Sequence, residues 1–307
     1  MIKVNYLNDS ALKIWYWKHI KIKVRRAIVS LGKKKQKNVW ISRLAKPKIL
    51  HDIIFEPLDT LKKRYTWIYE YLIECKNGDK SNIHLKFILK YSFLDGLRAE
   101  LVKRMNVKVC PYCNQAYVYT VDCTDGKQRN LCDLDHVLPK SKYSLFALSL
   151  WNLVPSCKSC NQTFKRTNAK EILSPVEDGF GDDCIFKIEF YNSIEAMLGN
   201  SDEFDILWDT SYAKNQAKKV KMEENIALFQ LNKLYAAHKQ EIKLILKKKA
   251  KFSGKTYLQS IHDMTNTTNT INVDEDMYKL LFGDYLTEDN YTMLIHAKMK
   301  HDILLHN

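Results

Sequence analysis

Three short stretches in the middle of the chain carry residue types suited to metal binding and acid–base chemistry. Two Cys-x-x-Cys pairs, "CPYC" at 110–113 and "CKSC" at 157–160, flank the stretch "LCDLDHVLPKSKY" at 131–143. A two-residue spacer lets two thiolates reach one ion from a tight turn, and two such turns make a closed tetrahedral zinc site. The spacing therefore predicts a structural zinc ion on Cys110, Cys113, Cys157 and Cys160.

The other four cysteines are interpreted differently. Cys123 and Cys132 could compete as zinc ligands, but we interpret them as hairpin or core residues. Cys75 and Cys184 have no partner at ligand spacing and are expected in the core. The alternative to a zinc site is a set of unrelated buried cysteines.

The stretch between the cysteine pairs combines a base with hard oxygen ligands. A histidine such as His136, with a pKa near ~6.5, can take a proton from water at neutral pH. The carboxylate of Asp135 suits a hard cation such as Mg²⁺. Asp133 lies two residues earlier, and the alternation of a strand would put both carboxylates on one face. Asp133 is therefore either an auxiliary metal ligand or a surface carboxylate.

The order and spacing of three motifs carry a family resemblance. "DLDHVLPKS", "WNLVPSC" and "CKSCNQTFK" follow one another within residues 108–168. This segment resembles the HNH endonucleases, which are ββα-metal nucleases, here with a zinc-binding frame of four cysteines. "CPYCNQAY" and "SPVEDGF" add a weaker likeness to stand-alone HNH proteins of prokaryotic restriction, retron and anti-phage systems.

The resemblance implies a role for each motif residue. His136 would be the general base, and Asn152 would pin the loop between two strands and orient that base. Asp135 and Asn161 would hold a catalytic Mg²⁺ or Mn²⁺. The third motif position is Asn161 rather than a histidine, and its amide oxygen favours these ions over Ni²⁺ or Zn²⁺. The implied reaction is hydrolysis of a DNA phosphodiester to 3′-hydroxyl and 5′-phosphate ends.

The charge of the chain favours a polyanionic partner. The net charge is +14, and the first fifty residues hold fourteen lysines and arginines against one acid, Asp9. Binding a nucleic acid releases counterions from such a surface. A solubilising basic face is the plain alternative. Beside the motif, four cations are predicted to contact phosphates unless they are only solvated surface charges: Lys140, Lys142, Lys165 and Arg166.

The remaining pattern predicts an α+β protein in three regions. A basic helical region at 1–106 and a helical region at 176–307 would flank a small ββα-metal domain with zinc knuckles at 107–175. Apolar spacing predicts helices at 56–74 and 225–249. Residues 116–123 alternate like a strand, with a turn at 123–126 and a returning strand at 130–138. The residues from 157 into Lys165 and Arg166 are expected to be helical, residues 265–270 to be a polar connector, and Thr287 to begin a last helix.

Other classes of function stay open. A zinc-stapled nucleic-acid-binding module without cleavage is one, and RNA is an alternative substrate to DNA. The nuclease could also be an effector subunit that acts only with an ATPase or sensor partner, since the chain has no Walker-type loop of its own. We interpret the other histidines, His238 and His296 among them, as packing residues.

The sequence also bears on the compartment. We expect a cytoplasmic protein with reduced cysteines and no membrane partner, because no secretory signal and no apolar run of about 20 residues is present. An amphipathic anchor at residues 10–30 is a minor alternative.

Overall fold

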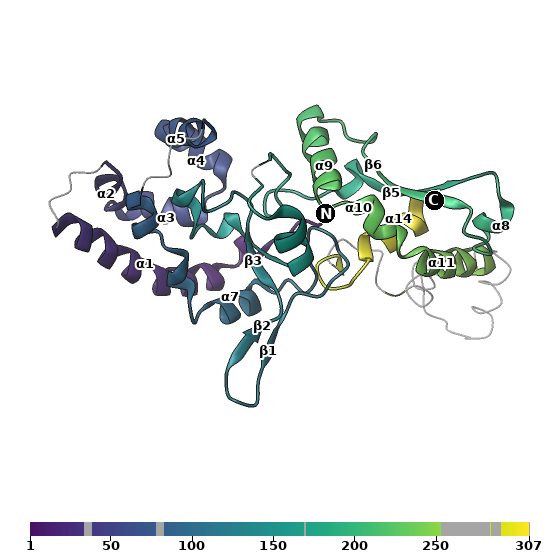
Figure 1. Ribbon diagram of the computed structural model, residues 1–307, viewed down its shortest axis with the longest axis horizontal. Coiled ribbons are helices and arrows are strands. Elements are labelled where there is room, and N and C mark those ends of the chain that lie inside the picture. Colours follow the sequence, from purple (N-terminus) through teal and green to yellow (C-terminus); the bar gives the residue numbers. More distant parts are fainter. Residues whose placement is uncertain (34–38, 78–82, 169, 253–282, 284–289, 307) are drawn as a thin grey trace, which may run out of the picture. The chain divides into compact units, whose positions relative to one another are not determined.

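The chain forms two compact units in the computed structural model, which describes residues 1–33, 39–77, 83–168, 170–252, 283 and 290–306 (Figure 1). The first, called here the N-terminal unit, comprises Lys3–Tyr112 and Tyr117–Gly179. The second, the C-terminal unit, comprises Met1–Ile2, Cys113–Ala116 and the described part of Phe180–Asn307. Residues 1–106 and 107–175, expected as separate regions, thus lie for the most part in one unit. The boundary between the units falls at Gly179 and Phe180, close to the expected start of the last region at residue 176.

A long first helix organises the N-terminal unit. After a short turn at η1 (Tyr6–Asn8), α1 (Ser10–Lys33) begins beside Asp9, whose carboxylate accepts hydrogen bonds from the backbone N–H groups of residues 11 and 12. A carboxylate at this place satisfies N–H groups that the helix cannot pair internally. Leu12, Tyr16, Ile20 and Val24 are buried at a spacing of four residues. The helix therefore packs one apolar stripe inward and leaves much of its basic surface exposed.

In the described part of this unit, the α-helices after α1 are α2 (Val39–Leu44), α3 (Pro47–Phe55), α4 (Leu58–Arg64), α5 (Thr66–Lys76), α6 (Ile83–Ile88) and α7 (Arg98–Met105), with the 3-10 turn η2 (Tyr91–Leu94) before α7. The single helix predicted at 56–74 is wrong in one respect, because Tyr65 is extended and separates α4 from α5. The break brings the Tyr65 hydroxyl within 2.8 Å and Arg64 Nη1 within 2.5 Å of one oxygen of the buried Asp52. A helix that continued through Tyr65 would not have the extended backbone that places the Tyr65 hydroxyl beside Asp52.

Two short antiparallel strand pairs follow. β1 (Thr120–Asp122) pairs with β2 (Gln128–Asn130) through a turn that contains Gly126 at φ 73°. This is the expected hairpin, but the returning strand is β2 and not residues 130–138. β3 (Asp133–His136) pairs instead with β4 (Leu153–Ser156), with Asp135 opposite Val154 and His136 opposite Leu153.

A helical turn completes a strand–strand–helix sequence. Ser159–Lys165 (η5) forms a π-helix and is the next element after β4. It lies where the sequence predicts a helix, at the second cysteine pair. Between β3 and β4 the chain forms a buried loop with two 3-10 turns, η3 (Ser144–Phe146) and η4 (Leu150–Asn152). The fold class is therefore mixed, with helices and small antiparallel strand pairs.

The N-terminal helices hold the β3–β4 loop by hydrogen bonds to its backbone. The hydroxyl of Tyr16 donates to the carbonyl of Leu148 at 2.8 Å, and the N–H of Leu145 donates to the hydroxyl of Tyr71 at 3.2 Å. On the loop's side, the Ser149 hydroxyl donates to a carbonyl of α3. Helices α1, α3 and α5 therefore act as a scaffold for this loop.

The C-terminal unit contains a strand pair that the sequence did not predict. β5 (Ile185–Phe190) and β6 (Phe204–Asp209) are antiparallel and are linked through a segment that includes α8 (Ile194–Met197). Phe186 and Trp208 lie on their buried face and pack against Tyr235, with ring centroids 5.4 and 5.3 Å from it. The region at 176–307, expected to be helical, therefore contains a strand pair beside its helices.

The helices of this unit are also divided more finely than predicted. In place of one helix at 225–249 there are α9 (Gln216–Leu228), α10 (Leu231–Ala236) and α11 (Lys239–Phe252). Gln230, at φ 51°, separates the first two, and α10 then places Tyr235 against the strands. The final described helix is α14 (Ala297–His306). The predicted connector at 265–270 and the predicted helix start at Thr287 lie outside the described residues. Among the described helices, none is both long and apolar enough to cross a membrane.

Candidate metal centre and buried Asp-His site

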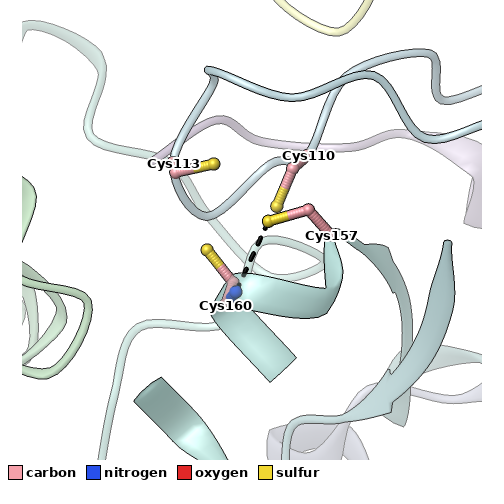
Figure 2. A group of neighbouring side chains, drawn as sticks. All are labelled: Cys110, Cys113, Cys157 and Cys160. Carbon is pink, nitrogen blue, oxygen red and sulfur yellow. Dashed lines mark hydrogen bonds between the residues drawn. The ribbon is translucent and has the colours of Figure 1, made fainter. Parts of the chain in front are cut away.

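The four predicted zinc ligands come together. Cys110 and Cys113 lie on the turn after α7, and Cys157 and Cys160 lie where β4 passes into η5. Their sulfur atoms are all within 4.8 Å of one another, and all four side chains are buried. Figure 2 shows the sulfurs turned toward a common centre, with the N–H of Cys160 directed at the sulfur of Cys157 at 3.4 Å. Four converging thiolates fit a tetrahedral Zn²⁺, whose sulfur ligands lie about 2.3 Å from the ion.

The other cysteines stay outside this group. Cys123 and Cys132, the two potential competitors, are not part of it. Cys75 and Cys184 are buried, as expected for core residues. The cluster could therefore hold one structural metal ion with no ligand beyond the four that the spacing predicted.

Asp135 is buried in β3 and already engaged at both oxygens. Lys165 Nζ lies 3.0 Å from Oδ1, and the hydroxyl of Tyr112 donates to Oδ2 at 2.7 Å. Burial, with the nearby Asp135 carboxylate, raises the pKa of Tyr112 well above its ordinary value, so the phenol stays a donor. Lys165 Nζ also donates to the carbonyl of His136 at 2.5 Å.

The burial of Lys165 differs from the expected surface position. Its side chain is 1% exposed and that of Asp135 is 3% exposed. A cation in this position compensates the charge of a carboxylate rather than facing a phosphate in solvent. Lys165 is therefore the one of the four predicted phosphate-contacting cations that this structure places inside the protein.

His136 is held as a neutral base. Its ring is buried, packs edge-on against Tyr91 at 4.8 Å, and places Nε2 3.0 Å from the carbonyl oxygen of Ala147. A carbonyl can only accept, so Nε2 carries the proton and Nδ1 keeps its lone pair. Burial lowers the pKa of His136 to about 3, and the positive charges of Lys140 and Lys165 act in the same direction.

Asn152 fastens both ends of the β3–β4 loop. Its Oδ1 accepts from the N–H of Leu138 at 2.7 Å, and its Nδ2 donates to the carbonyls of Leu138 at 3.1 Å and Phe146 at 3.0 Å. The side chain is fully buried. Because Ala147 follows Phe146, these contacts also fix the carbonyl that orients the ring of His136.

Asn161 faces Asp133 rather than Asp135. Its Nδ2 donates to Asp133 Oδ2 at 2.9 Å, and Gln162 Nε2 donates to the same oxygen at 2.8 Å. Carboxylate and amide oxygens are suitable donors for Mg²⁺. These contacts nevertheless do not fit an ion shared by Asp135 and Asn161, because Asp135 is bound to Lys165 and Asn161 is bound to Asp133.

Near His136 lies a group of basic and aromatic residues that local sequence patterns did not predict. Lys140 is exposed and places Nζ 3.8 Å from the centre of the Tyr91 ring, and the guanidinium carbon of Arg98 lies 4.6 Å from the same ring. Lys142 is half-buried with Nζ 3.5 Å from a backbone carbonyl of α5, and Arg166 is exposed. Tyr91 and Arg98 lie far from the motif in sequence, so no local signal marked them.

Comparisons with protein-family models, with curated proteins and with solved structures each give no match to this chain.

Proposed function

We propose that the chain is an endonuclease of the HNH type that hydrolyses phosphodiester bonds of DNA. The observation that supports this most directly is the neutral His136, oriented through Ala147 by a loop that Asn152 fastens. A protein that only binds nucleic acid has no need of a base held in this way. The zinc ion on the four cysteines would hold the frame on which β4 and η5 meet.

In the proposed reaction His136 acts as the general base. Its Nδ1 takes a proton from water while the water oxygen bonds to phosphorus, the bond from phosphorus to the 3′ oxygen breaks, and the leaving oxygen takes a proton from solvent. Lys140 and Arg98, which lie against Tyr91 beside His136, would draw the phosphate toward His136 and offset the negative charge of the phosphate. The requirement for Mg²⁺ or Mn²⁺ stays a prediction of the resemblance, because the present contacts of Asp135 and Asn161 do not support it.

A second candidate is a zinc-stapled module that binds nucleic acid without cutting it. The buried pair of Asp135 and Lys165 favours it, since a metal ion at Asp135 would have to displace a lysine that is itself only 1% exposed. The biological setting, whether a prokaryotic defence system or an effector subunit controlled by an ATPase or sensor, rests on the resemblance alone.

Nicking of supercoiled plasmid by the purified full chain tests the proposal. Wild type, His136→Ala and a control, His19→Ala on α1, are compared with Mg²⁺, Mn²⁺ or EDTA, and with single-stranded DNA and RNA as further substrates. We expect metal-dependent cutting that His136→Ala loses and His19→Ala keeps. Cutting by His136→Ala at the wild-type rate would reject the base assignment. DNA binding without cutting by all three would favour the binding module or a nuclease that needs its partner.

A further inference from the structure

Three metal-binding side chains meet in the C-terminal unit, away from the four cysteines in sequence. His238 directly precedes α11, Glu241 lies in the first turn of α11, and His296 directly precedes α14. One ligand atom from each residue lies within 4.8 Å of those from the other two. The arrangement brings together two imidazoles and one carboxylate.

The group is held in place from several sides. His296 Nδ1 lies 2.7 Å from Glu241 Oε2, and Lys300 Nζ lies 2.9 Å from the other oxygen of Glu241. The ring of His238 is 4.2 Å from the ring of His296. The backbone of His296 has φ 57°, and its N–H donates to the carbonyl of Asn114 at 2.7 Å. A positive φ is uncommon for a non-glycine residue, although less so for histidine than for most others.

One nitrogen in the group has no partner among the described residues. His296 is 3% exposed, and its buried Nε2 makes no hydrogen bond within the part of the chain that the structure describes. Leaving a buried polar atom unpaired costs free energy, so most such atoms in folded proteins are paired. An ion pair between His296 and Glu241 explains the position of Nδ1 but leaves Nε2 unexplained. The two nitrogens of an imidazole point in different directions, so an ion that Glu241 also binds would lie on the Nδ1 side of His296. Such an ion accounts for three metal-binding side chains that converge in a buried, fixed group.

We propose that His238, Glu241 and His296 bind a divalent transition-metal ion of the zinc class. Imidazole nitrogen suits Zn²⁺, Cu²⁺, Fe²⁺ and Ni²⁺, and two imidazoles with one carboxylate are a known three-ligand set for Zn²⁺ that leaves one position for water. The ion would join the start of α11 to the start of α14, whose ligands Glu241 and His296 are 55 residues apart in the chain. Such a cross-link contributes binding free energy to folding.

This site is independent of the proposed nuclease chemistry. None of its ligands belongs to the Asp-His motif or to the four-cysteine cluster, and the two metal sites differ in ligand type. Thiolate ligands give bound Co²⁺ an intense charge-transfer band, whereas nitrogen and oxygen ligands give only weaker visible bands. The two sites can therefore be distinguished in one protein sample.

The test is the metal content of the full chain after equilibration with Zn²⁺ and removal of loose metal. We expect about two zinc ions per chain in the wild type, and the loss of one of them in His238→Ala and in Glu241→Gln. His19→Ala serves as the matched histidine control and should keep both. A wild type that holds a single ion, or variants that hold as much as the wild type, would overturn the proposal.

A second measurement, on the wild type, decides the question if the variants fail to fold. His296 is buried, so the half-buried His238 and Glu241 are the residues to replace. If these variants lose both ions through unfolding, Co²⁺ titration of the wild type decides. A second cobalt ion that adds visible absorption without thiolate charge transfer supports the site. Saturation after one ion with thiolate bands alone rejects it.

Discussion

Lys165 Nζ lies 3.0 Å from Asp135 Oδ1, and both side chains are buried. The pair joins the helical turn η5 to strand β3, so it links two of the three elements of the strand–strand–helix sequence. It also gives Asp135 a cation that belongs to the protein itself. Any metal ion proposed for Asp135 has to compete with this ammonium group or displace it.

Replacing Lys165 with methionine should leave an uncompensated buried carboxylate. We expect Lys165→Met to lower the free energy of unfolding by about 3–5 kcal/mol, measured by urea denaturation. The double variant Asp135→Leu with Lys165→Met should regain most of the loss, because it removes both charges. Lys142→Met, a half-buried lysine without an ion pair in the described structure, is the control and should change stability by about 0.5 kcal/mol or less. Equal effects of the two single variants would contradict a structural role for the pair.

Removal of one thiolate should abolish zinc binding at the four-cysteine cluster. A closed zinc site contributes its binding free energy to folding, so we expect Cys157→Ser to lose that zinc ion and to unfold the residues around it. Metal analysis and circular dichroism measure the two effects. Cys123→Ser, a cysteine outside the cluster, should keep both the metal and the fold. Retention of zinc by Cys157→Ser would show that a different ligand set is used.

Local spacing was sufficient to predict the four-cysteine cluster but not the pairing of the strands. Two residues between cysteines fix a turn by themselves, and the four cysteines are found together. The partner of β3 is β4, which begins at Leu153, and no local turn signal joins them. The nearest turn signal therefore assigns the residues of β3 to the hairpin of β1, although the partner of β1 is β2.

The burial of Lys165 had no local signal either. Its counter-charge, Asp135, is 30 residues away in the chain, so a basic residue at the end of a helix looked like a surface cation. The strands β5 and β6 did leave a signal in the alternation of "FKIEF" and "FDILW". The helical patterns on either side of β5 and β6 nevertheless led to the prediction of a helical region at 176–307.

Asn152 offers a test of how the β3–β4 loop positions the base. Asn152→Ala would leave three backbone groups of the loop without their partner, and we expect a loss of about 2–4 kcal/mol in urea denaturation. If the enzyme is a nuclease, the turnover rate should fall while KM for DNA changes little, because Asn152 acts through His136. Asn152→Asp keeps the acceptor for Leu138 N–H and loses both donors. Its new carboxylate oxygen would face the carbonyls of Leu138 and Phe146 without a proton to donate, so Asn152→Asp should lose at least as much stability as Asn152→Ala.

Asp52 should make stability depend on pH in the acid range. Burial alone would raise the pKa of Asp52, but hydrogen bonds from Tyr65 and Arg64 outweigh it and hold the pKa below its ordinary value. Its contribution is therefore complete above the pKa of an unfolded aspartate and is lost as the pH falls through the folded pKa. Urea denaturation of wild type and Asp52→Asn at about pH 7 and about pH 3 should show a larger acid loss for the wild type. Parallel losses would mean that other carboxylates dominate.

Lys140 and Lys165 should behave differently toward DNA, because only the first is exposed. Each phosphate contact contributes about one unit to the slope of log K against log salt. Lys140→Gln should therefore weaken DNA binding for all sequences and reduce that slope by about one unit. Lys63→Gln, an exposed lysine on α4, is the matched control for a general loss of charge. Fluorescence anisotropy at several salt concentrations gives the slopes. Identical slopes for wild type and Lys140→Gln would place the DNA on another surface, and the exposed basic side of α1 would be the next one to test.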